Sequence, residues 1–158
     1  MGLDMYLTKK TYIGAQYEYR NVKGVIEITE GKDNKPVNIK FNRVCEISER
    51  VGYWRKANAI HNWFVTNVQG GEDNCQEYEV SEEKLNELLA NCKEVLQHKG
   101  KAASKIPTKG GFFFGGTDYD DGYFEDISDT IKIIEDILAE KPEGQDYLGG
   151  DIYYRSSW

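Results

Sequence analysis

Residues 81–96 read SEEKLNELLANCKEVL. Their apolar side chains recur at the spacing of one helix face: Leu85, Leu88, Leu89, Cys92 and Leu96. Ser81 is a typical N-cap residue, and the two glutamates that follow it suit the positive end of a helix dipole. The stretch therefore predicts an amphipathic helix, and Cys92 within its apolar stripe is interpreted as a packing residue.

Two further helices are predicted on either side of this one. The first spans about Tyr53 to Gln69 and ends at two glycines. The other runs from about Tyr123 to Glu140 and ends before Pro142. Its apolar face is regular: Phe124, Ile127, Ile131, Ile134 and Leu138.

Strands are predicted in the first third of the chain and at its end. Apolar and polar residues alternate over residues 3–8 and again over residues 37–42, as in half-buried strands. Residues 25–28 precede a polar turn at 31–36 and are expected to form a hairpin, whereas 11–20 is a weaker strand or a loop. Residues 110–116 predict a short buried strand between glycines, and residues 152–158 are expected to lie in the sheet.

The predicted fold is α+β, a single domain over residues 1–158, with a mostly antiparallel sheet and about three helices packed on one face. The chain carries 27 acidic and 20 basic residues, a net charge of −7, which disfavours direct binding to nucleic acid. Three widely spaced cysteines without a CxxC pair suggest reduced thiols, and no apolar run approaches the length of a membrane span. We expect a cytoplasmic protein.

A histidine lies among the apolar positions of the first predicted helix. We expect His61 to be mostly shielded from solvent there and to need a hydrogen-bond partner, and Asn58 lies at the edge of the same stripe. Either the histidine is a core residue bonded within the protein, or the stripe meets a ligand-binding cavity. The second interpretation gives a set of candidate binding residues: Trp54, Arg55, Asn58, His61, Phe113, Thr117, Asp118, Tyr119, Tyr154 and Arg155. In this set Trp54, Asn58 and His61 are expected to face residues 112–119, with Tyr154 or Arg155 nearby, and Arg155 is the expected anchor for an anion.

Catalytic and metal-binding patterns are incomplete. His61 would need Asp73, Cys75 or Asp118 as a partner for hydrolase or transferase chemistry, and Cys75 lies among acidic residues that disfavour its thiolate. The chain has only two histidines, and residues 117–122 do not fit an EF-hand loop. No catalytic residue, metal or cofactor is therefore assigned.

Three blocks, residues 53–65, 111–120 and 153–158, together with the opening residues 1–7, resemble an uncharacterised family of small bacteriophage and prophage proteins. Members of that family sometimes carry an automatic phosphoglycerate kinase label. The label does not fit 158 residues without a phosphate-binding loop, because that activity needs two domains. The resemblance implies an accessory phage protein in a bacterial cell.

The expected function is binding without catalysis. In that setting, the chain is expected to bind a host component and to counteract antiviral defence, by sequestering a small anionic or planar, nucleotide-like ligand or by blocking a defence protein. Homo-oligomers are compatible with this role. A small hydrolase or transferase using His61 is the alternative. A second alternative is an acidic mimic of DNA, built from carboxylates of the third predicted helix and the residues before it: Asp118, Asp120, Asp121, Glu125, Asp126 and Asp129.

Overall fold

The computed structural model describes residues 2–145 and 148–158. Its strands are β1 (Asp4–Tyr12), β2 (Ile28–Glu30), β3 (Lys35–Val37), β4 (Glu46–Arg55), β5 (Tyr78–Glu79) and β6 (Asp151–Ser157). Its α-helices are α1 (Asn58–Asn67), α2 (Glu82–Gln97), α3 (Ala102–Lys105) and α4 (Asp121–Ala139). Short 3-10 turns cover Glu18–Arg20, Phe41–Arg43 and Lys99–Lys101.

The chain forms two compact units. One combines the residues before Lys10 with Glu49–Trp158, and the other is Lys10–Ser48. We call them the body and the arm. The body holds the helices α1 to α4, and the arm holds the hairpin of β2 and β3.

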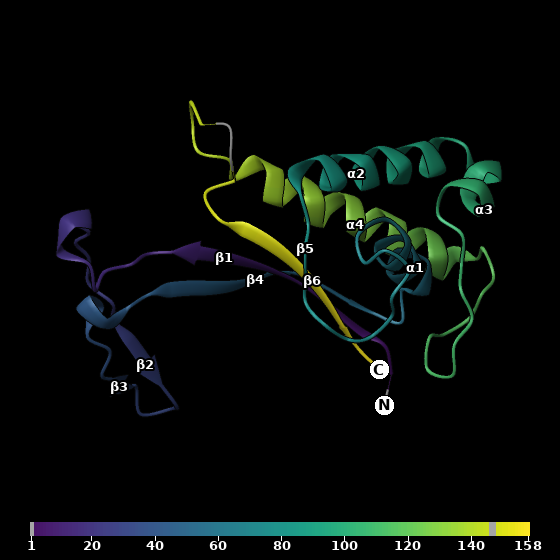
Figure 1. The fold of residues 1–158 in the computed structure, drawn as a ribbon. Helices are drawn as coiled ribbons and strands as arrows, with labels where there is room; N and C mark the ends of the chain where they lie inside the picture. The colour runs from purple at the N-terminus through teal and green to yellow at the C-terminus, as the bar shows by residue number, and fades with distance from the viewer. Residues whose placement is uncertain (1, 146–147) are drawn as a thin grey trace. The chain divides into compact units, whose positions relative to one another are not determined.

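A four-stranded sheet in the order β4-β1-β6-β5 organises the body. β5 and β6 run antiparallel, with Tyr78 opposite Tyr154. At the start of β1 the carbonyl of Leu3 accepts a hydrogen bond from the Lys56 amide at 2.8 Å. α1, α2 and α4 cover one face of this sheet (Figure 1), so the predicted mostly antiparallel α+β architecture is confirmed.

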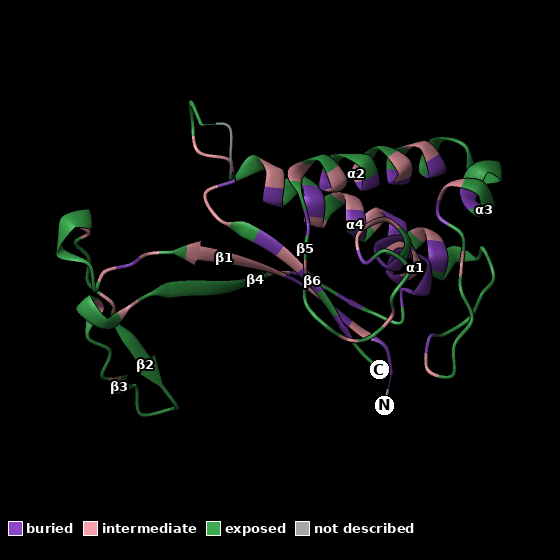
Figure 2. Cartoon of the chain, in the orientation of Figure 1, coloured by how far each residue is buried: buried purple, intermediate pink, exposed green. Residues whose placement is uncertain are grey.

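The core lies between the sheet and these helices. Every second residue of β6 is buried, as are Met5 and Leu7 in the first half of β1, while their neighbours are partly or fully exposed (Figure 2). This is the period-2 pattern expected of a sheet that is covered on one face. Gly52 of β4 lets α4 approach closely, because a Cβ atom at this position would lie 2.8 Å from Cγ2 of Ile133. The helices α2 and α4 were predicted from their apolar stripes, and both are confirmed with caps at Ser81 and Asp120.

The first predicted helix begins later than expected. Tyr53, Trp54 and Arg55 belong to β4, and α1 starts at Asn58. Trp54 is buried between two exposed residues, which is strand alternation and not a helix stripe. Pairing with β1 continues as far as Lys56, where a left-handed backbone with φ of +61° turns the chain into α1. Sheet pairing thus overrides the helical periodicity of this segment.

Other expected strands are shorter or absent in the described residues. The segment 110–116 forms a turn in which the Phe114 amide donates to the Gly111 carbonyl, and Phe112 is 94% exposed. Gly115, with φ of +89°, has a backbone that does not suit a strand. Residues 37–42 pair only up to Val37, opposite Ile28, and the hairpin strand begins at Ile28 rather than at residue 25. The C-terminal strand is confirmed as β6.

Candidate functional site

His61 of α1 lies in a chain of hydrogen bonds that runs from the core to the protein surface. Its Nδ1 is 2.7 Å from the Tyr154 hydroxyl of β6, and its Nε2 is 2.9 Å from Oδ2 of Asp73. The indole of Trp158 donates to Oδ1 of the same carboxylate at 3.0 Å. Four side chains therefore connect α1, the loop that follows it and the C-terminal strand.

The charge state of His61 follows from these partners. Because a carboxylate only accepts, Nε2 carries the proton and donates to Asp73, while Nδ1 accepts from the phenol of Tyr154. Burial lowers the pKa of His61 below its usual 6.5, although the hydrogen bond and charge of Asp73 act in the opposite direction. The imidazole is therefore neutral at pH 7, as its predicted burial required.

This network suits a structural role better than proton transfer to a substrate. His61 has no exposed surface, and both ring nitrogens already have partners within the protein. Burial also raises the pKa of Tyr154 well above 10, so its phenol remains a hydrogen-bond donor. Of the three partners considered for His61, the structure brings Asp73 to it, whereas Cys75 and Asp118 make no hydrogen bond to its ring in the described part of the chain.

Asn58, at the first turn of α1, is hydrogen-bonded to the glycine-rich loop of residues 110–116 and to the backbone just before it. Its Nδ2 donates to the carbonyls of Phe114 at 3.1 Å and Gly116 at 2.6 Å, and its Oδ1 accepts from the Lys109 amide at 3.1 Å. The predicted contact of Asn58 with residues 112–119 is therefore confirmed. His61 also meets this segment, since its ring lies edge-on to Phe114 with 5.1 Å between centroids.

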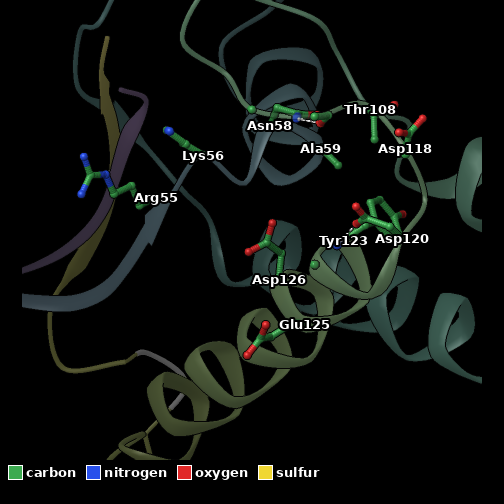
Figure 3. A pocket seen from close by; sticks show the side chains of 13 residues that line it. Arg55, Lys56, Asn58, Ala59, Thr108, Asp118, Asp120, Tyr123, Glu125 and Asp126 are labelled. Carbon is green, nitrogen blue, oxygen red and sulfur yellow. Dashed lines mark hydrogen bonds between the residues drawn. The ribbon is translucent and has the colours of Figure 1, made fainter. Parts of the chain in front are cut away.

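A cleft of about 310 Å³ opens beside this loop in the body. It lies between the junction of β4 and α1, the loop that carries Thr108 and Asp118, and the first turns of α4 (Figure 3). Its lining residues are Arg55, Lys56, Asn58, Ala59, Thr108, Gly115, Gly116, Asp118, Asp120, Gly122, Tyr123, Glu125 and Asp126.

Charge is unevenly distributed around the cleft. Figure 3 shows the carboxylates of Asp120 and Asp126 below Ala59, with Arg55 and Lys56 on the other side of the space. Asp120 caps α4 by accepting from the Tyr123 amide. Asp126 has no ion pair or side-chain hydrogen bond within the described residues, and burial together with the charges of Asp129, Glu125 and Asp120 raises its pKa to about 6. We call the side of the cleft formed by Asp120 and Asp126 the acidic wall. It thus carries a carboxylate, Asp126, that lacks a compensating cation within the described residues.

The sheet surface opposite the helices carries a second group of polar and aromatic residues. The rings of Tyr6 and Tyr53 lie 5.5 Å apart, and the Arg50 guanidinium lies 4.8 Å from the centre of the Tyr6 ring. The Tyr53 hydroxyl donates to Asp4, yet 45% of Tyr53 remains exposed. This group combines flat rings with guanidinium charge.

The predicted binding residues do not form one site. Arg55, Asn58 and Asp118 line the cleft, whereas His61 and Tyr154 lie in the buried network.

Trp54 does not face the glycine-rich loop as predicted, because its indole donates to Thr130 of α4. Arg155 is exposed on β6 and is not part of the cleft lining.

Three predicted residues stabilise the loop itself. The carbonyl of Phe113 accepts from the Leu3 amide, and the carbonyl of Thr117 accepts from the Thr108 hydroxyl. The Tyr119 hydroxyl accepts from the Thr108 amide and its ring packs against Tyr123.

Sequence reasoning did not include Lys56 and Asp126 among the binding candidates. Asp126 is one of several carboxylates near the start of the third predicted helix, and nothing in the sequence distinguishes it from its exposed neighbours. Its partial burial therefore had no sequence signal. Lys56 was placed inside a helix, and the turn that brings it to the cleft follows from the strand that replaces this helix.

The described residues contain no group of three or more histidine, cysteine or acidic side chains placed to hold a metal ion. No helix in the described ranges is long and apolar enough to cross a bilayer. Comparisons of the sequence and of the fold with known proteins found no matching family model, no similar curated protein and no similar solved structure.

Proposed function

We propose that this chain is a binding protein that holds a small ligand with a cationic group in the cleft, without converting it chemically. The observation that carries the proposal is Asp126, a half-buried carboxylate without a cationic partner on the acidic wall. Ionising such a group is costly unless an opposite charge comes near. An amine or guanidine of a ligand supplies that charge.

The size and rims of the cleft narrow the class of ligand. A volume of about 310 Å³ is at the lower end of the range for small-molecule pockets, roughly 300–1,000 Å³. Asp118, beside Thr108 on the lining of the same cleft, offers a further acceptor, while Lys56 on the other side of the space suits an anionic or carbonyl group of the same ligand (Figure 3). The cleft therefore favours a compact amine that also carries a polar tail.

Within the phage setting implied by the sequence resemblance, a binding protein without turnover acts by stoichiometric sequestration. The ligand would then be a host metabolite or signal, and occupancy of the cleft would set the effect on host defence. Support for this part of the proposal comes from the buried state of His61, which leaves the most plausible acid–base group without access to a substrate.

Calorimetric titration with agmatine, which carries an amine and a guanidine, tests the proposal, with adenosine monophosphate as the anionic comparison. Agmatine is expected to bind in a one-to-one ratio, and Asp126→Asn should weaken it at least about tenfold, which corresponds to 1.4 kcal/mol. Asp136→Asn is the matched control, since Asp136 is an exposed residue of the same helix that does not line the cleft. Equal affinity of both variants, or tighter binding of the nucleotide, contradicts the proposal.

A second candidate function rests on the uncovered sheet face. Tyr6, Tyr53 and Arg50 offer stacking and positive charge to a planar anion such as a nucleotide or a single-stranded nucleic acid. Fluorescence titration with a short oligothymidine distinguishes this case. Tyr53→Ala should weaken its binding several-fold while leaving agmatine binding unchanged, and the absence of saturable oligonucleotide binding rules this candidate out.

A further inference from the structure

The arm, Lys10–Ser48, lacks a hydrophobic core. All of its residues are described, and Gly14 is the only one of them that is buried. Its thirteen larger apolar and aromatic side chains are all at least partly exposed: Tyr12, Ile13, Tyr17, Tyr19, Val22, Val25, Ile26, Ile28, Val37, Ile39, Phe41, Val44 and Ile47. Val25 is 93% exposed and Tyr19 83%.

Such exposure is unusual for a segment with this composition. Burying one large aliphatic or aromatic side chain contributes roughly 1.5–3 kcal/mol, so the arm forgoes much of its available stabilisation. A unit of this size, below about 40 residues, ordinarily needs a disulfide, a metal or assembly to be stable. Cys45 is its only cysteine, and no metal-binding group is present in the described residues. Assembly is the remaining source of stability.

The hairpin within the arm also has unpaired edges. Among residues 2–145 and 148–158, β2 and β3 pair only with each other, over three residues each, from Ile28 opposite Val37 to Glu30 opposite Lys35. An isolated two-stranded sheet is marginally stable, and its free edges pair readily with further backbone. Contact with another surface would therefore stabilise both the hairpin backbone and the apolar side chains around it.

The charge of the arm indicates which surface it meets. The arm carries seven basic and five acidic residues, a net charge of +2, whereas the rest of the chain carries 13 basic and 22 acidic residues, a net charge of −9. Each chain therefore holds both a basic apolar segment and a strongly acidic body. Opposite charges of this kind attract and orient two surfaces before apolar contact forms.

We propose that the arm is a dimerisation element that docks onto the body of a second copy of this chain. The arm of each chain docks onto the body of the other, so that two identical contacts are made and a closed twofold dimer results. The partner is a second copy because the complementary acidic surface is present in equal amount in every chain. Docking would remove apolar residues such as Val25 and Ile28 from water.

The test is sedimentation or light scattering of the full chain over a concentration series at two salt concentrations. We expect a dimer at low salt, with a dissociation constant that rises about tenfold between 0.05 and 0.5 M salt because screening weakens the charge attraction. Val25→Asp and Ile28→Asp should each shift the protein to monomer. Thr29→Asp adds the same charge at the next position of β2 without removing an apolar side chain, and should weaken the dimer less than either of these variants.

A second measurement identifies the contact. Mixed unlabelled and nitrogen-15-labelled chains, joined by a zero-length lysine–carboxylate cross-linker, should give inter-copy links between arm lysines such as Lys23 or Lys40 and carboxylates of the body. The proposal is overturned by a chain that stays monomeric at about 100 µM, a concentration at which contacts of about −5.5 kcal/mol are populated. It is also overturned by a dimer that Val25→Asp leaves unchanged, or by a dimer whose links do not involve the arm. Binding of agmatine is measured separately, so failure of this inference leaves the proposed function standing.

Discussion

The phenol of Tyr154 donates a hydrogen bond to Nδ1 of His61 across 2.7 Å, and neither side chain has any surface exposed to solvent. This pair connects β6 to α1 within the core. The Tyr154 ring also stacks on Phe64 of α1, with 4.0 Å between centroids. The contact therefore combines a polar and an apolar interaction within one pair of elements.

Replacement of Tyr154 by Phe should keep the ring stacking and remove the donor to His61. The buried Nδ1 is then left unpaired, which costs about 1–3 kcal/mol of unfolding free energy. Tyr53→Phe is the control, because Tyr53 bonds to Asp4 at the surface, and it should cost less than about 1 kcal/mol. Urea unfolding at pH 7 measures the unfolding free energy of both variants. Equal losses would show that the buried hydrogen bond contributes no more to stability than the bond at the surface.

Stability should fall when the pH is lowered past the usual pKa of histidine. Because the pKa of His61 is lower in the folded chain than in the unfolded chain, the unfolded chain binds more protons below about pH 6.5, and protonation favours unfolding. The unfolding free energy of the native chain should therefore decrease from pH 7 downward. His61→Asn should show a smaller decrease over the same range, whereas a parallel decrease in both proteins would contradict the assignment.

Asp126→Asn should stabilise the protein at pH 7 and have little effect near pH 4. The pKa of Asp126 rises from 3.8 to about 6 on folding, so the folded chain binds this proton more tightly than the unfolded chain. Loss of the proton as the pH rises through this window therefore lowers the unfolding free energy. We expect a gain of the order of 1 kcal/mol at pH 7, since partial exposure reduces the effect of the shift. Thermal unfolding at the two pH values measures the difference.

Trp158 should contribute through its indole nitrogen as well as its ring. Trp158→Phe keeps a ring beside Phe114 but removes the donor to Asp73, and should cost about 0.5–1.5 kcal/mol. Trp158→Ala removes both and should cost more. If the two variants have the same unfolding midpoint, the hydrogen bond carries the whole effect and the ring contact none.

Gly52→Ala should destabilise the body by about 1–3 kcal/mol, because the added methyl would press on Ile133 and force β4 and α4 apart. Gly100→Ala is the matched control, since nothing lies within 4 Å of the position of its new Cβ atom. A circular dichroism melt of both variants compares the two. The expectation fails if Gly52→Ala melts at the temperature of the native chain.

Local sequence signals were reliable for the helices and strands whose structure depends mainly on their own residues. The apolar stripe of residues 85–96 and the cap at Ser81 predicted α2, and the patterns of residues 3–8 and 152–158 predicted β1 and β6. Leu96 departs from that stripe, because it is exposed and Val95 is the buried residue at the end of the helix. The burial of His61 followed from its apolar neighbours for the same reason. These features depend on periodicity and on capping, which a single sequence displays.

Features that depend on distant pairing were not predictable. Tyr53 to Arg55 fit a helix and a strand equally well, and β1, some 50 residues away, decides in favour of the strand. The cleft needs Asp126 of α4 beside the turn at Lys56, an arrangement that no local pattern records. The loop at Phe112 was judged buried from its apolar composition, although its glycines and its bond to Asn58 make it a surface turn.

The order of strands in the sheet has a consequence for synthesis on the ribosome. β1 is made first, but one of its two neighbours in the sheet is β6, which begins at Asp151. While the nascent chain emerges, Leu3, Met5 and Leu7 have no strand on that side to complete their cover. The body therefore completes its sheet only after residues 151–157 have left the exit tunnel, and a chain that stops before them would leave β1 without its partner on that side.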